Sequence, residues 1–171
     1  ENENPLAAQN EKEDCSINLD WRKKVAFRAV LEPMQVNRFN CRLEVKKNYV
    51  RIAKPDETDR HFCVQNERMS VKISKLTGLI DEYTVDGKAR LKPGAGLIKV
   101  FSDNEDPWGM TVDGFCSQAG EFALMSDKDA NSFIGYPDEQ LPNVRVTENG
   151  DVRMKIQALF EYGKSTALVT Y

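Results

Sequence analysis

The sequence predicts a mainly β fold in which antiparallel sheets pack as a sandwich. Several stretches alternate apolar and polar residues at period two, and the hairpin signals Asp86-Gly87 and Asn149-Gly150 each join two of them. No amphipathic stretch of about 15 residues favours a long helix. Because the expected strands are apolar on one face, sheets packed face to face are the arrangement that buries those faces.

The N-terminal part predicts a polar lead-in followed by a small β-domain. Residues 1–14 are polar with little periodicity. Three strands are then expected from alternation, the first ending before Pro33, at residues 25–31, 41–46 and 49–53.

A charged, proline-containing stretch at residues 54–60 indicates a surface connection. We place the domain boundary just after it. Residues 1–62 then form the lead-in and small β linker domain, and residues 63–171 the first part of a large β-sandwich domain.

Residues 69–91 show the clearest alternation in the chain and predict a three-stranded meander. Alternation over residues 69–74 gives one strand, and Thr77-Gly78 turns the chain into a second strand over residues 79–85. Asp86-Gly87 supplies the two positive-φ positions of a type I′ turn, after which residues 88–91 return.

Further along the chain the pattern predicts a second hairpin and one short helix. Residues 144–146 precede Asn149-Gly150, a long strand over residues 152–161 follows it, and residues 166–171 form a last strand after another turn. Ser126, followed by acidic residues, is typical of a helix N-cap, so a helix to about Phe133 is expected.

Composition excludes several function classes. There are 27 acidic and 24 basic residues, a net charge of −3, with neither a clustered basic footprint nor a long apolar run. We therefore expect no nucleic-acid and no membrane partner. The four cysteines, Cys15, Cys41, Cys63 and Cys116, contain no C-x-x-C pair, and reduced thiols in a cytoplasmic protein are expected. His61 is the only histidine and is interpreted as a surface or interface residue.

One loop combines carboxylates with an indole. It carries Asp103, Asn104, Glu105, Asp106 and Trp108. Sugar hydroxyls bind carboxylate and amide oxygens, while the C–H face of a sugar stacks on an aromatic ring, so these residues are candidates for contact with substrate. The alternative is a loop whose polar side chains satisfy its own backbone and whose Trp packs in the core.

A second acidic run, Asp127-x-Asp129-x-Asn131, resembles the start of a calcium-binding EF-hand loop. Such a loop needs Gly at its sixth position and Glu at its twelfth, where this chain has Ser132 and Asp138. A capped helix explains the same acids. No metal site and no catalytic residue is assigned in this chain.

Three segments resemble the large β-domain of glycoside hydrolase family 38, the α-mannosidases, and a fourth is similar to its small linking β-domain. The first three are FCVQNERMSVKISKLTGLIDEYTVDGKARL, the acidic SDNEDPWGM loop and VRVTENGDVRMKIQALFEYGKSTALVTY; the fourth is KKVAFRAVLEPMQVNRF. Their order and spacing cover most of the chain from about residue 20.

The resemblance implies part of a galactose-mutarotase-like supersandwich. It also implies a parent enzyme that hydrolyses α-mannosides with retention, whose catalytic barrel, with its zinc and nucleophile, maps onto none of this sequence. This chain is then a noncatalytic region without its own cofactor, inactive alone. It braces the barrel, lends loops to the sugar cleft, and meets mannosides and oligosaccharides through the rest of the same polypeptide.

Two alternatives remain open. An independent carbohydrate-binding module would use Trp108 or Trp21 as a stacking platform. A structural sandwich would be stabilised by calcium at SDNED or DKDAN. A fragment would also leave the strand near residues 164–171 without its natural cover, so self-association or partial disorder of that strand is expected.

Overall fold

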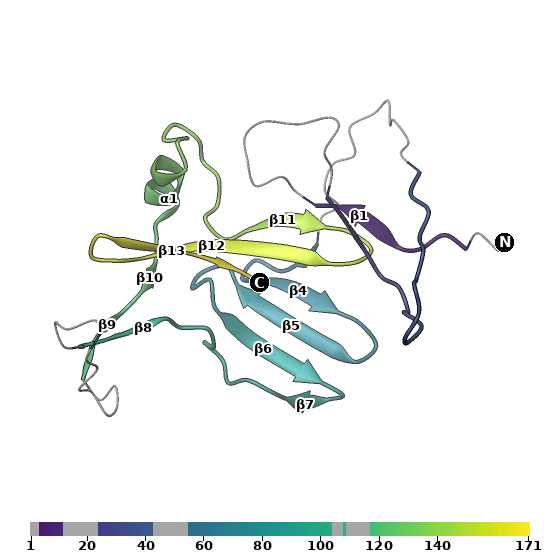
Figure 1. Cartoon of the computed structure of the whole chain (residues 1–171). Coiled ribbons are helices and arrows are strands. Elements are labelled where there is room, and N and C mark those ends of the chain that lie inside the picture. Colours follow the sequence, from purple (N-terminus) through teal and green to yellow (C-terminus); the bar gives the residue numbers. More distant parts are fainter. Residues whose placement is uncertain (1–3, 12–23, 43–54, 104–107, 109–116) are drawn as a thin grey trace. The chain divides into compact units, whose positions relative to one another are not determined.

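The structure, a computed structural model, describes residues 4–11, 24–42, 55–103, 108 and 117–171 (Figure 1). It confirms the mainly β class. The described part holds short antiparallel strands and one short helix. None of its helices is long and apolar enough to cross a bilayer.

The chain divides into two compact units. The first contains residues 1–54 and 146–155, and the second contains residues 55–145 and 156–171. The expected domain boundary at residues 62 and 63 stays a prediction; in the structure, strand β4 spans that position within the sheet of the second unit.

In the first unit, strand β1 (Ala8–Asn10) pairs antiparallel with β2 (Val25–Phe27). The strand expected over residues 25–31 is therefore too long, because the chain leaves the ladder after Phe27 and turns into a loop closed by Asn37. Asn37 Oδ1 accepts from the Glu32 amide at 2.9 Å, and its Nδ2 donates to the Glu32 and Gln35 carbonyls at 3.0 and 3.1 Å.

Two expected strands of the small β-domain fall mainly outside the described residues. Residues 41–42, described here, are not in a strand. The remainder of the expected strand at 41–46, and the whole of that at 49–53, lie outside the described residues.

The second unit contains a five-stranded meander that confirms the expected hairpins. Its strands pair consecutively and antiparallel: β3 (Asp56–Glu57), β4 (His61–Gln65), β5 (Met69–Ser74), β6 (Ile80–Val85) and β7 (Lys88–Ala89). Asp86 and Gly87 have φ values of 50° and 72°, as a type I′ turn requires.

A second sheet is built around the long strand β12 (Met154–Tyr162). Its neighbours are β10 (Ala123–Leu124), β11 (Arg145–Asn149) and β13 (Ser165–Thr170). The hairpin at Asn149-Gly150 is present, but its turn is wider than a two-residue turn: Gly150 lacks positive φ, and its amide donates to the Arg153 carbonyl at 3.1 Å.

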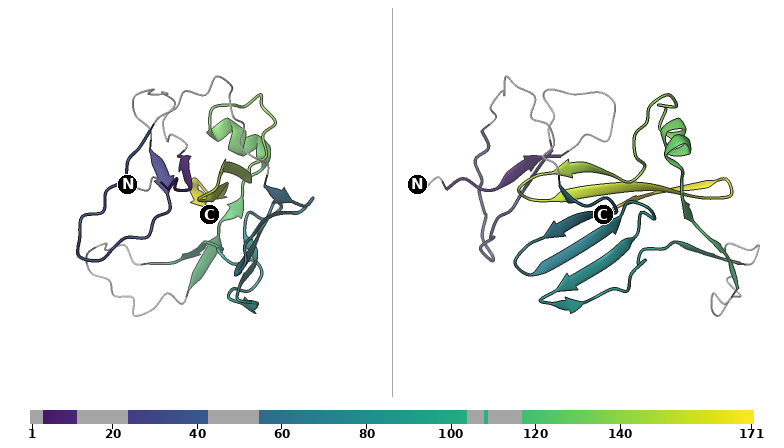
Figure 2. Two further views of the ribbon diagram at one scale, coloured as in Figure 1. Left: turned by 90° about the vertical axis from the view of Figure 1, so that its right-hand side faces the viewer. Right: turned by 180° about the vertical axis from the view of Figure 1, so that it is seen from behind.

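The two sheets contact each other inside the second unit through β12. Gly78, in the turn between β5 and β6, has φ of 68°, and a Cβ there would lie 2.8 Å from the Phe160 ring and 3.2 Å from Ala158. Leu159, on the opposite face of β12, packs with Met125 and Ala130. The meander therefore covers one face of β12, as face-to-face packing of sheets requires, and the region of helix α1 covers the other face (Figure 2).

The short helix α1 (Asp127–Phe133) forms where the N-cap signal placed it. Ser126 Oγ accepts from the Asp129 amide at 3.1 Å. Buried Asn143 ties this region to β12, since its side chain donates to the Met125 and Leu159 carbonyls and accepts from the Leu159 amide. These bonds satisfy a polar group that burial would otherwise penalise.

Strand β13 is paired with β12 along its whole length, from Ser165 opposite Tyr162 to Thr170 opposite Gln157. The tight turn at Gly163, with φ of 59°, lets this strand fold back onto β12. Partial disorder of the strand stays a prediction. Pairing of its other edge with a second copy stays a prediction.

Candidate functional site

The acidic run with its tryptophan lies in sequence between the two strands of a small sheet. Strands β8 (Lys99–Phe101) and β9 (Gln118–Glu121) pair antiparallel, and the loop connects them. Its base is closed by the Ser102 amide, which donates to the Ser117 carbonyl at 2.8 Å. Both ends of the loop are thereby held together.

An aromatic side chain from β12 fixes the base of this loop. The Tyr162 hydroxyl donates to the Ala119 carbonyl at 3.2 Å, and its ring lies against Gly120, where a Cβ would collide with it. The Tyr162 ring also lies 5.8 Å, centroid to centroid, from Phe122. Glycine at position 120 therefore allows β9 to approach the second sheet closely.

The structure describes two of the five candidate sugar-contacting residues. Trp108 is 94% exposed, and Asp103 is also exposed. This exposure contradicts the alternative in which Trp108 packs in the core of this chain. Asn104, Glu105 and Asp106 lie outside the described residues, as does Trp21.

The second acidic run serves the fold of the helix region. Asp127 Oδ1 accepts from the Asn143 amide at 2.8 Å, and Asp129 Oδ2 accepts from the Ser126 hydroxyl at 2.6 Å. Asn131 is 2% exposed and donates to the carbonyls of Glu139 and Leu141. The capped-helix interpretation thus accounts for these side chains.

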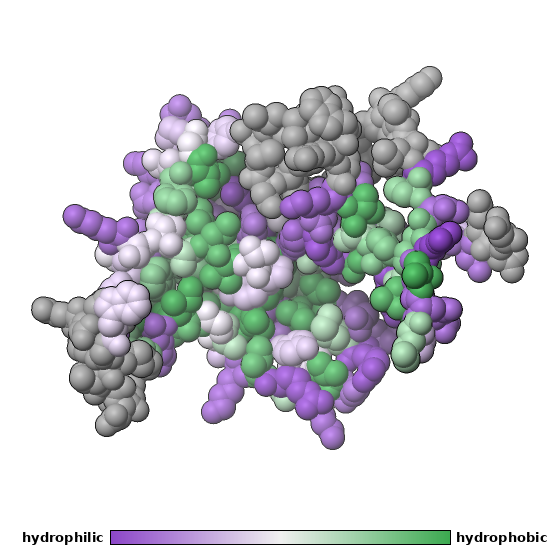
Figure 3. All heavy atoms as spheres, in the orientation of Figure 1, coloured by the Kyte–Doolittle hydropathy of each residue, from purple (hydrophilic) through white to green (hydrophobic). Residues whose placement is uncertain are grey.

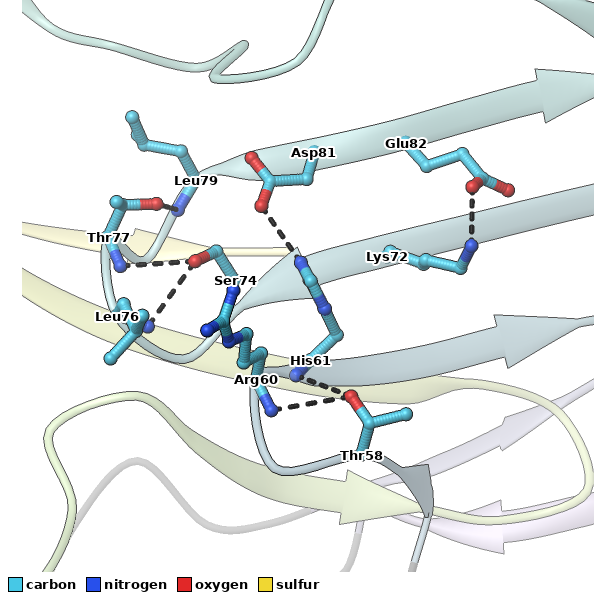
Figure 4. Close-up of polar contacts among 10 residues, drawn as sticks. All are labelled: Thr58, Arg60, His61, Lys72, Ser74, Leu76, Thr77, Leu79, Asp81 and Glu82. Carbon is cyan, nitrogen blue, oxygen red and sulfur yellow. Dashed lines mark hydrogen bonds and ion pairs between the residues drawn. The ribbon is translucent and has the colours of Figure 1, made fainter.

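A polar cluster missed by sequence reasoning lies on one face of the five-stranded sheet (Figure 4). His61 on β4 reaches across β5, and its Nε2 lies 2.9 Å from Asp81 Oδ2 on β6. In the pairing of β5 with β6, Lys72 lies opposite Glu82, and the next residue, Ile73, lies opposite Ile80. Asp81 therefore has no partner on β5, and this β-bulge directs its side chain toward His61. Alternation alone gives no signal for a bulge, which is why this pair was missed.

Next to this pair, a charged ladder crosses β5 and β6. Lys72 Nζ lies 2.6 Å from Glu82 Oε2, and the Ser70 hydroxyl donates to Glu82 Oε1 at 2.9 Å. The Lys72 ammonium, and secondarily the Ser70 hydroxyl, lower the pKa of Glu82 below its ordinary value. Glu82 raises the pKa of Lys72 in turn. Both groups stay charged near neutral pH, so this ladder favours strand pairing over proton transfer.

Cys41 and Cys63 are free thiols, while Cys15 and Cys116 lie outside the described residues. Within the described ranges, no three or more His, Cys, Asp or Glu side chains gather in a way that could hold a metal ion.

In comparisons with known proteins, no family model matches the chain, and neither a curated protein nor a solved structure does. Among the described side chains, the exposed Trp108 indole, in a loop whose two ends are held together, is the one best suited to binding a ligand.

Proposed function

We propose that this chain is a noncatalytic β-region of an α-mannosidase-type glycoside hydrolase that binds part of the sugar through the loop between β8 and β9. The single observation that supports the sugar-binding loop is the 94% exposure of the Trp108 indole, which agrees with a ring that faces another domain of the longer enzyme. A large aromatic ring exposed to water offers a stacking face for a sugar, and the sequence carries three carboxylates within five positions of Trp108 that supply hydrogen-bond acceptors.

The rest of the proposal follows the resemblance to glycoside hydrolase family 38. The five-stranded meander and the sheet around β12 belong to a galactose-mutarotase-like supersandwich in a cytoplasmic parent enzyme. The rest of that polypeptide supplies the barrel, the zinc and the catalytic carboxylates. Residues 1–171 brace the barrel and carry no catalytic group.

The first experiment compares hydrolysis of a chromogenic α-mannoside by residues 1–171 and by the longer natural gene product, both with added zinc. We expect activity only in the longer protein. Activity of the short chain alone, or of neither protein, would contradict the proposal.

Trp108→Ala in the longer enzyme tests the loop itself. Loss of one stacking contact is expected to raise KM about tenfold, roughly 1.4 kcal/mol, without lowering Tm, because the indole is exposed. Tyr136→Ala, which removes an aromatic ring that is 59% exposed elsewhere, is the matched control and should change neither quantity. Unchanged kinetics in the Trp108 variant would remove this loop from the sugar site.

The same exposed indole favours a second function, an independent carbohydrate-binding module. In that case residues 1–171 bind a mannose oligosaccharide in calorimetry, Trp108→Ala abolishes the heat of binding, and the longer gene product hydrolyses no α-mannoside.

A further inference from the structure

We infer that two copies of this chain associate head to tail, with the apolar loop at residues 30–36 of one copy docking on an acidic, aromatic patch after helix α1 of the other. The inference is independent of the sugar-binding proposal.

The loop displays apolar side chains to solvent. Val30, Leu31, Met34 and Val36 are each at least 64% exposed. Scattered apolar residues are ordinary on a surface, but four exposed ones within seven positions are unusually dense for a surface that faces only water. Figure 3 shows hydrophobic and hydrophilic atoms next to one another where this segment, dark blue in Figure 1, runs.

The loop holds its shape through Asn37. The three hydrogen bonds from the Asn37 side chain to the backbone of Glu32 and Gln35 close the turn, in which Met34 has φ of 56°. These bonds also satisfy backbone groups that docking would remove from water. Little ordering is therefore left to occur on binding, which reduces its entropic cost.

The patch in the second unit is built in a similar way. Phe133, Tyr136 and Leu141 are 60%, 59% and 40% exposed. The chain that carries them folds back along α1, because the buried Asn131 amide donates to the Glu139 and Leu141 carbonyls and the Tyr136 amide donates to the Asn131 carbonyl.

The charges around the two surfaces are opposite. Arg28 and Arg38 lie on either side of the loop, which contains one acid, Glu32, whereas Asp138 and Glu139 lie within the patch, which contains no basic side chain between Phe133 and Leu141. Arg28, Arg38, Asp138 and Glu139 are all exposed. Because the loop is flanked by basic side chains and the patch by acidic ones, a contact between a loop and a patch brings opposite charges together. A contact between two loops or between two patches would bring like charges together.

The two surfaces differ, so the contact is heterologous, and each added copy leaves one loop and one patch open. Four loop side chains bury less area than a stable dimer interface of roughly 1,200–2,000 Å², so the association is weak, in the range of about 10–1,000 μM.

The test is sedimentation velocity of residues 1–171 over a concentration series at low and high salt. We expect an average mass that rises with concentration and falls toward the monomer in roughly 0.5 M salt, because screening weakens the charge attraction. A monomer at all concentrations, including one in which the loop docks on its own patch, would overturn the inference.

Charge reversal identifies the surfaces. Arg28→Glu with Arg38→Glu reverses the loop, and Asp138→Lys with Glu139→Lys reverses the patch. Each double variant alone should be monomeric, while an equimolar mixture should associate again, since each altered surface then meets a complementary one.

Leu168→Lys on β13 is the control for association through the exposed edge of that strand. The inference would be overturned if the Leu168 variant is monomeric while both charge-reversed proteins still associate. It would also be overturned if the mixture of the two charge-reversed proteins stays monomeric. Circular dichroism verifies that every variant is folded.

Discussion

At the scale of single residues, Gly78 meets two separate requirements. Its φ of 68° is unfavourable for residues with a side chain, and the Phe160 and Leu124 side chains leave no space for a Cβ. The turn between β5 and β6 can therefore lie against β12 only because this position has no side chain.

Gly78→Ala is accordingly expected to lower the free energy of unfolding by about 2–4 kcal/mol, combining backbone strain with overpacking. Gly163→Ala is the matched control: φ there is 59°, but nothing lies within 4 Å of the added Cβ. It should cost only about 1–2 kcal/mol. Urea denaturation measures both, and equal losses would show that the contact with Phe160 is unimportant.

The ion pairs on the meander predict how stability changes in acid. The Lys72 ammonium lowers the pKa of Glu82 below its ordinary 4.5, and the Arg68 guanidinium lowers that of Asp86 below its ordinary 3.8. A carboxyl group with a lower pKa in the folded state stabilises the fold above its unfolded pKa, and this contribution disappears as pH falls through the folded value.

Tm is therefore expected to change little from pH 7 to about 5 and to fall below about 4.5. Lys72→Met removes the main cause of the Glu82 shift, so the acid-induced fall in Tm should be shallower than in the wild type. Parallel Tm profiles of the two proteins would contradict this assignment.

At the scale of elements, the sequence pattern predicted the turns, strands and helix that are stabilised by neighbouring residues. The type I′ turn, the meander and the helix N-cap were predicted because turn chemistry and capping depend on neighbouring residues. The strand at residues 25–31 was predicted too long, since its end depends on β1 and on Asn37 rather than on its own alternation. The turn after Asn149 was also not specified locally, because Gln9 takes part in it from a distant position.

Gln9 stabilises the hairpin of β11 and β12 from strand β1. Its Oε1 accepts from the Val152 and Arg153 amides, both at 2.9 Å, and its Nε2 donates to the Arg153 carbonyl at 3.1 Å. Gln9→Ala should therefore speed hydrogen exchange of these two amides about tenfold, while the β5 amides of the meander keep their rates. Asn10→Ala, at an exposed neighbour in the same strand, is the control. Unchanged exchange at Val152 would show that the turn holds itself.

At the scale of the whole molecule, the division into two units can be tested through a buried carboxylate of the first unit. Glu148 is 4% exposed, and its oxygens lie 2.9 Å from Arg153 Nε and from Lys155 Nζ. Arg153 also pairs with Glu11 at 3.0 Å. Removing Glu148 leaves two cations without their buried partner.

Glu148→Ala is expected to destabilise the first unit by about 3 kcal/mol. Hydrogen exchange should accelerate in β1 and β2, with β5 and β6 unchanged if the units open separately. Glu57→Ala, which removes an exposed ion pair with Lys75 in the second unit, should cost under about 1 kcal/mol. Equal acceleration across all these strands in the Glu148 variant would indicate one cooperative molecule.

The candidate site also combines features that the sequence predicts with features that depend on distant parts of the chain. The sequence alone was sufficient to single out Trp108 and Asp103, because an indole within an acidic run is visible without a fold. Whether the indole faced core or solvent could not be predicted from that run, because burial of a side chain depends on the packing of the rest of the fold. The pair of His61 and Asp81 was invisible for the same reason, as it requires three strands and a bulge.

The sequence by itself thus determined the β class, the hairpins of the meander, the long strand β12 and the capped helix, since these follow from period, turn residues and capping within a few positions. The tertiary structure decided which faces are covered, where β2 ends, how the chain divides at residues 146–155, and which charged groups meet. Those features depend on packing and hydrogen bonds between different elements, whose partners lie from 20 positions apart, for His61 and Asp81, to 144 positions apart, for Gln9 and Arg153.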